Sequence, residues 1–129
     1  MNKPKIHNDL FAADVPLVDG IIEHIVLLPD QAKVHFRTEQ GEQATFTFEQ
    51  TVGVWDRRSV GQEIGGLSTL PVALANLYIR ELLHNDVEFG ELDQQTLDRI
   101  SVYSFTNSWS EMPILEIAAT EMLVQRGGV

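Results

Sequence analysis

Residues 32–49 read AKVHFRTEQGEQATFTFE, and this stretch decides the fold. On either side of its single glycine, apolar and polar side chains alternate, as expected for strands that bury one face. Centring the turn on that glycine pairs Phe36 with Phe46 and Val34 with Phe48, so that both pairs share one face. The pattern therefore predicts a β-hairpin with a buried aromatic face.

Three further segments have the composition of strands. Residues 20–28, GIIEHIVLL, are rich in aliphatic and β-branched side chains and are followed by turn-forming Pro29 and Asp30. They extend the hairpin into a three-stranded meander. Residues 100–105 and 114–124 predict two late strands.

A helix is predicted between these two groups of strands. Ser68 or Thr69 can cap its start, Pro71 suits its first turn, and Asn85 can end it. Apolar residues between these points recur at helical spacing and form a broad stripe, which favours packing against a sheet. A second, short helix is expected at residues 93–98.

These elements predict an α+β fold. We expect a mainly antiparallel sheet, built from the N-terminal meander and two C-terminal strands, with one main helix packed on it. The 129 residues are expected to form a single domain, residues 1–129. Residues 1–16 are interpreted as a peripheral lead-in with a helical turn at 10–13, and residues 125–129 as a frayed tail.

Charge and composition narrow the function classes. Nineteen acidic and nine basic side chains give a formal net charge of −10, which disfavours nucleic-acid binding. The chain has no cysteine, which excludes disulfides, cysteine-ligated metals and a thiol nucleophile. It has no apolar run of membrane-spanning length and no signal-peptide pattern, so we expect a cytoplasmic protein without membrane contact.

Two histidine patterns were weighed as metal sites. His24 and His35 lie on strands expected to pair, so their rings can approach across the hairpin, but no third ligand is evident. Glu81 and His84 match a Glu-x-x-His motif, but di-iron sites need a second copy and two more glutamates. We therefore predict no metal or other cofactor, and no catalytic motif selects an active site.

Two groups of residues are candidates for binding a partner. The first is an acidic stretch with no lysine or arginine between its ends, which suits a basic partner: Glu81, Asp86, Glu88, Glu91, Asp93 and Asp98. The second combines tryptophan and arginine, which are favoured at binding hot spots: Trp55, Arg57, Arg58 and Trp109. A solubilising acidic surface and tryptophans buried in the core are the structural alternatives.

The sequence thus favours a non-catalytic protein-binding function, such as that of an inhibitor or a toxin-immunity-type protein. One alternative is a small-molecule-binding or hydrolytic domain with a pocket between sheet and helix. Another is a homo-oligomer joined through an exposed sheet edge. The sequence leaves the partner, the substrate and the oligomeric state open.

Overall fold

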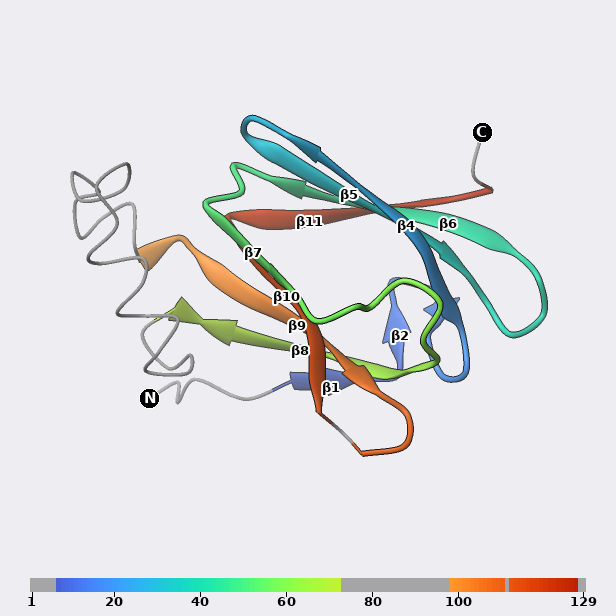
Figure 1. The fold of residues 1–129 in the computed structure, drawn as a ribbon. Helices are drawn as coiled ribbons and strands as arrows, with labels where there is room; N and C mark the ends of the chain where they lie inside the picture. Colours follow the sequence, from blue (N-terminus) through green and yellow to red (C-terminus); the bar gives the residue numbers. More distant parts are fainter. Residues whose placement is uncertain (1–6, 73–97, 111, 128–129) are drawn as a thin grey trace.

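The computed structural model describes residues 7–72, 98–110 and 112–127. Two antiparallel sheets face each other across the core, and a two-stranded ribbon lies beside them (Figure 1). The five-stranded sheet, in spatial order, is β1 (His7–Asp9), β8 (Ile64–Pro71), β9 (Ser101–Asn107), β10 (Pro113–Ala119) and β7 (Gly53–Asp56). The four-stranded sheet is β11 (Glu121–Arg126), β6 (Gln43–Glu49), β5 (Gln31–Arg37) and β4 (Ile21–Leu28). The ribbon pairs β2 (Phe11–Ala12) with β3 (Val15–Pro16).

The predicted α+β class is wrong, because every element of the described residues is an antiparallel strand. Ser68, Thr69 and Pro71, expected to begin the main helix, belong to β8 and pair with β9. The local capping signal is overridden by pairing with a strand distant in sequence, which also buries Leu67 against the core. Pro71 is tolerated because it ends its strand. The remainder of this predicted helix and most of the one at residues 93–98 lie outside the described residues.

The predicted buried face of the hairpin is confirmed, but the predicted register is wrong. Val34 lies opposite Phe46, Phe36 lies opposite Ala44, and Phe48 lies opposite Ala32 of β5. All of these side chains are buried. A slip of two residues keeps each side chain on its face, so the alternation alone could not detect the error.

The turn between β5 and β6 explains the slip. The N–H of Thr38 donates to the carbonyl of Glu42 at 2.8 Å, which leaves three residues in the loop. Gly41 takes the last of these positions with φ of 90°, rather than the centre. Three-residue hairpin loops place a left-handed residue there, and glycine adopts that conformation without steric cost.

Aromatic rings join the two sheets across the core. Phe46 lies 5.8 Å from Phe105 of β9 between ring centroids, and Phe48 lies 5.2 Å from Tyr103. Within the four-stranded sheet, Phe36 stacks obliquely on Phe46 at 5.4 Å. The hairpin's inner face and the inner face of β9 therefore form one hydrophobic core.

The segment predicted as one strand at residues 114–124 is two strands, one in each sheet. The chain leaves the five-stranded sheet after β10 and enters the four-stranded sheet as β11, with the change at Thr120. The N–H and hydroxyl of Thr120 both donate to the carbonyl of Glu49, at 3.0 and 3.2 Å. The chain also passes from the four-stranded to the five-stranded sheet between β6 and β7. Because β6 pairs with β11 and β7 pairs with β10, the two changes of sheet lie next to each other and form one corner (Figure 1).

Both ends of the described chain differ from the prediction. The expected lead-in forms β1, β2 and β3 instead of a helical turn, and Ala12 and Val15 are buried in the core. The expected frayed tail at residues 125–129 is wrong for Gln125 and Arg126, which pair with β6. Arg126 also forms ion pairs with Asp14 and Glu42. Among the described residues, no helix is long and apolar enough to cross a membrane.

Truncating Phe46 to alanine should destabilise the protein by about 3–5 kcal/mol, since the fully buried ring contacts both sheets. Urea unfolding would measure the change in the free energy of unfolding. Thr47→Ala is the matched control, because Thr47 is the next residue along β6 on the opposite face. A loss below about 1 kcal/mol for Phe46→Ala would contradict the assigned core.

Candidate functional site

Two loops at one end of the five-stranded sheet lie against each other. One joins β7 to β8 through residues 57–63, and the other joins β9 to β10 through residues 108–112. Asn107 donates its amide hydrogen to the side-chain oxygen of Gln62 at 2.8 Å, and the N–H of Ser108 donates to the carbonyl of Glu63 at 3.2 Å. We call residues 57–63, 107–110 and 112 together the loop surface.

Trp109 is the most prominent side chain of the loop surface, with 83% of its area exposed. Its backbone is nevertheless held in place, because the side-chain oxygen of Asn107 accepts the N–H groups of Trp109 at 2.6 Å and Ser110 at 3.2 Å. The N–H of Asn107 also donates to the carbonyl of Met112 at 2.8 Å, closing the base of the loop. An ordered loop thus presents an indole to solvent, with exposed Met112 and Val60 on the same two loops.

Gly65 allows the two loops to approach so closely. A side chain at this position would place its Cβ 3.0 Å from the Cα of Ser108 and 3.2 Å from the carbonyl oxygen of Asn107. Such distances to backbone atoms leave no room for a methyl group unless the loop moves away. The register of β8 and β9 shifts at this glycine, between Ile64 and Gly66.

The β7–β8 loop is held by its own polar side chains. The carboxylate of Asp56 accepts the N–H of Ser59 at 2.9 Å and its hydroxyl at 2.7 Å, and Ser59 is fully buried. Gln62 donates its amide hydrogen to the carbonyl of Arg58 at 2.6 Å, where the backbone is left-handed with φ of 57°. The exposed Arg58 side chain therefore projects from a fixed turn.

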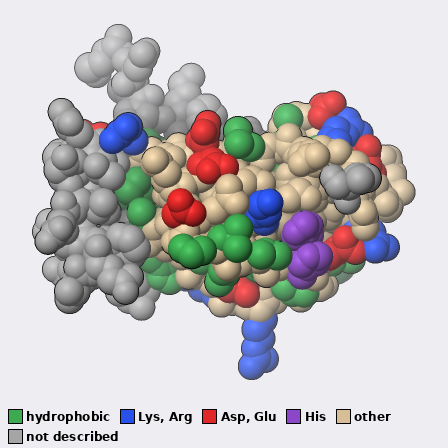
Figure 2. Space-filling view, turned by 90° about the horizontal axis from the view of Figure 1, so that it is seen from above, with side chains coloured by type: hydrophobic (Ala, Val, Ile, Leu, Met, Phe, Trp, Pro, Cys, Tyr) green, Lys and Arg blue, Asp and Glu red, His purple; other side chains and the backbone are tan. Residues whose placement is uncertain are grey.

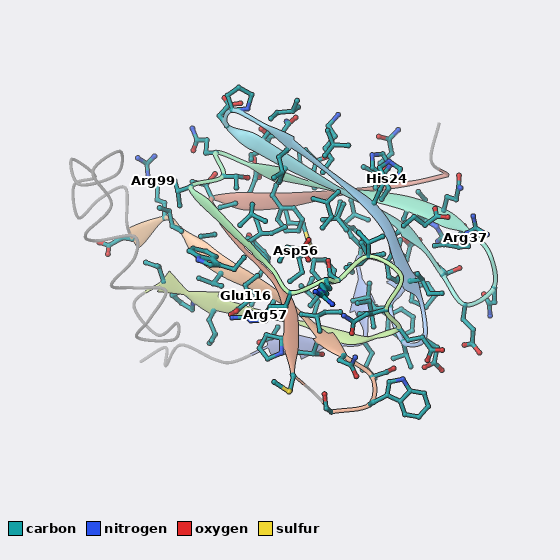
Figure 3. The ribbon with its side chains drawn as sticks, in the orientation of Figure 1. His24, Arg37, Asp56, Arg57, Arg99 and Glu116 are labelled. Carbon is teal, nitrogen blue, oxygen red and sulfur yellow. The ribbon has the colours of Figure 1, made fainter. Side chains whose placement is uncertain are left out.

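Arg57 turns back onto the sheet. Its guanidinium lies 2.7 Å from a carboxylate oxygen of Glu116, and it also donates to the carbonyl of Pro113 at 3.3 Å (Figure 3). Glu116 is only 7% exposed, and the hydroxyl of Ser104 donates to its other oxygen at 3.4 Å. A buried carboxylate needs such partners, since burying it unpaired is costly. Arg57 therefore helps to neutralise Glu116 and to join β7 to β10.

The sequence predicts no role for Glu116 beyond its place in a strand. Its one sign in the sequence is a single charged residue within an apolar run, Ile114 to Ala119. Trp55 lies opposite Glu116 in the register of β7 and β10. It packs, half-buried, against a small second hydrophobic cluster that includes Val102.

The structure brings together only part of the predicted binding group. Arg57, Arg58 and Trp109 all belong to the loop surface, and Trp55 lies in the strand that leads to it. Of the acidic stretch, Asp98 is described and exposed. The other predicted acidic residues lie outside the described residues: Glu81, Asp86, Glu88, Glu91 and Asp93.

His24 and His35 are register partners on the outer face of the four-stranded sheet. Their rings stack with centroids 4.1 Å apart and an angle of 14° between planes. Figure 2 shows the two rings side by side next to hydrophobic side chains. Ring nitrogens bind metals through lone pairs in the ring plane, so stacked rings direct them along parallel planes rather than toward one ion. No group of three potential metal ligands occurs within the described ranges.

The pKa of His35 lies below its usual 6.5. Loss of solvent is the largest cause, followed by repulsion from His24 and from Lys33, while Glu23 acts in the opposite direction. Glu23 is itself paired with Arg37. Protonating His35 is therefore less favourable in the folded protein than in the unfolded chain.

The free energy of unfolding should fall as the pH drops below about 6.5. Because the folded ring of His35 binds its proton more weakly than the unfolded chain does, acid favours unfolding. The loss begins near pH 6.5 and is complete below the lowered pKa. Urea unfolding at pH 7.5 and at pH values down to 5.5 would measure it, and His35→Gln should reduce the slope. Equal slopes for the two proteins would contradict this role of the pair.

Comparisons of the chain with protein-family models, with curated proteins and with solved structures give no match. The chemistry and geometry of the described surfaces are therefore the basis for proposing a function.

Proposed function

We propose that this protein is a non-catalytic binding protein, of the inhibitor or toxin-immunity type, and that the loop surface engages a protein partner. The observation that carries this proposal is Trp109, an almost fully exposed indole on an ordered loop. Large exposed apolar side chains cost solubility, and tryptophan is the residue most enriched at the centres of protein interfaces.

The energetic argument begins with area. A buried tryptophan removes about 150–250 Å² from water, which corresponds to roughly 4–6 kcal/mol before the costs of association. The hydrogen bonds of Asn107 fix the backbone of Trp109 in advance. Ordering of the loop is then not an additional cost of binding.

Charge supplies the second argument. A net charge of −10 on a small protein attracts basic partners over a distance and repels acidic ones. In this proposal the acidic residues from Glu81 to Asp98 speed the encounter, and Trp109 supplies the contact that slows dissociation. Exposed Arg58 offers a hydrogen-bonding group on the same loop surface.

The polar groups near the loop surface favour binding over hydrolysis. The hydroxyl of Ser59 is buried and donates to Asp56, so it is not presented to a substrate. The carboxylate of Glu116 is paired with Arg57 and accepts a hydrogen bond from Ser104. These groups stabilise the loop and the sheet, which leaves Trp109, Met112 and Val60 as the exposed large apolar side chains of the loop surface.

Trp109→Ala should weaken partner binding by at least about 30-fold, since a hot-spot residue contributes 2 kcal/mol or more. Native lysate would be passed over immobilised wild type, Trp109→Ala and Leu123→Ala, and the retained proteins quantified. The product of the neighbouring reading frame is the first candidate to test, and its dissociation constant would then be measured. Leu123 is a matched control because it is an exposed apolar residue of β11, in the other sheet.

A second variant separates the anchor from its support. Asn107→Ala keeps the indole but removes the acceptor that holds the loop, so it should weaken binding less than Trp109→Ala and more than the control. The proposal is contradicted if the three immobilised proteins retain the same partners, or if Leu123→Ala loses the partner that Trp109→Ala keeps.

A further inference from the structure

In the described part of the chain, the two larger sheets have four edge strands, and these differ in how they are protected. β1 and β7 are short, with three and four residues. β11 has six residues and carries Glu121 and the ion-paired Arg126. Short edges and charged side chains are the usual protection against pairing with another chain. These three edges are therefore poor templates for a further strand.

β4 lacks this protection. It has eight residues, and from His24 to Leu28 it carries no acidic or basic side chain other than the histidine, in a chain with net charge −10. Leu27 is 63% exposed and Leu28 is 46% exposed. A long apolar edge of this kind favours addition of a strand.

The accessible part of this edge has a defined length. At its start, the N–H of Gly61 donates to the carbonyl of Ile22 at 2.8 Å, and Ile21 forms a bridge with Glu63. The register of β4 and β5 shifts just after Ile22, at Glu23. Among the described residues, no strand pairs with the outer edge of β4 beyond that point. The accessible segment therefore begins at His24, after the covered edge and the bulge, and ends with the strand at Leu28.

We propose that a second copy of this chain pairs with this segment, β4 against β4 in antiparallel orientation. The two-fold axis would pass beside Val26, so that Val26 faces its own copy and His24 faces Leu28 of the other chain. This register keeps His24, Val26 and Leu28 on the outer face of both sheets, because opposite residues in an antiparallel pair share a face. It joins two four-stranded sheets into one continuous sheet. Both β4 edges are then paired, so no further copy can add through this edge and the assembly is a dimer.

Charge and area set the expected strength. The neutral segment lets two acidic chains meet without placing carboxylates opposite each other. Five residues on each side bury less area than a standard interface, so the dissociation constant should be on the order of 0.1 mM. This inference goes beyond the proposed function, because it needs neither the loop surface nor another protein.

Sedimentation equilibrium of the purified chain, from about 10 µM to 1 mM, tests the proposal. The wild type should pass from monomer to dimer. Leu27→Lys should weaken association at least tenfold, because it adds a lysine to the pairing edge at a position where folding tolerates exposure. Leu123→Lys adds the same charge to the opposite edge strand and should leave the dissociation constant of the dimer unchanged. Trp109→Ala should also leave it unchanged.

The register has its own test, since the chain has no cysteine. With oxidised glutathione as the electron acceptor, Val26→Cys should form an intermolecular disulfide, because two residues directly opposite each other are 4.5–5.5 Å apart at Cα. Leu123→Cys should cross-link far more slowly. In sedimentation, the proposal is overturned by a wild type that stays monomeric at about 1 mM, by species larger than a dimer, or by equal effects of Leu27→Lys and Leu123→Lys. In cross-linking, it is overturned if Val26→Cys and Leu123→Cys form disulfides equally fast. A change in Trp109→Ala alone would assign self-association to the loop surface instead.

Discussion

The structure depends on the packing of the aromatic face of β6 against β9. Phe46 and Phe48 meet Phe105 and Tyr103 across the core, and these residues come from segments more than fifty positions apart in the sequence. Hydrophobic burial favours this contact, while the turn at Gly41 fixes which residues of β5 and β6 share the face. The two sheets are held together by this contact and by the corner at Thr120, where paired strands pass from one sheet to the other.

The loop surface is a consequence of that arrangement. Because β7 and β10 are neighbours, Arg57 reaches Glu116 and Pro113, and because β8 and β9 are neighbours, Gln62 reaches Asn107. The sheet thus sets the positions of both loops, and their side chains fix the local backbone. Binding residues commonly lie on loops held by a rigid scaffold, and the exposed Trp109 fits that relationship.

The alternation of apolar and polar residues predicts the buried face of β5 and β6 correctly, because successive side chains of a strand point to opposite faces. The alternation does not fix the register of β5 and β6, because the number of residues in the turn decides the register. It also does not divide residues 114–124 into two strands, because the apolar pattern continues through the corner between them. The helix signals at Ser68 and Pro71 were local, and pairing with β9 overrode them. Residue type alone indicates Arg57, Arg58 and Trp109 as binding residues, and the order of the strands places them on one surface. Buried Glu116 can be recognised only from the register of β7 and β10, which places it beside Arg57.

The central claim is that an ordered loop holds the indole of Trp109 in water. The most direct measurement combines amide hydrogen exchange at Trp109 and Ser110 with acrylamide quenching of Trp109 emission, recorded in a Trp55→Phe background so that one tryptophan remains. We expect slowed exchange at both amides, whose N–H groups donate to Asn107, together with readily quenched emission typical of a solvated indole. Exchange at the rate of an unfolded chain, or an indole shielded from acrylamide, would contradict it.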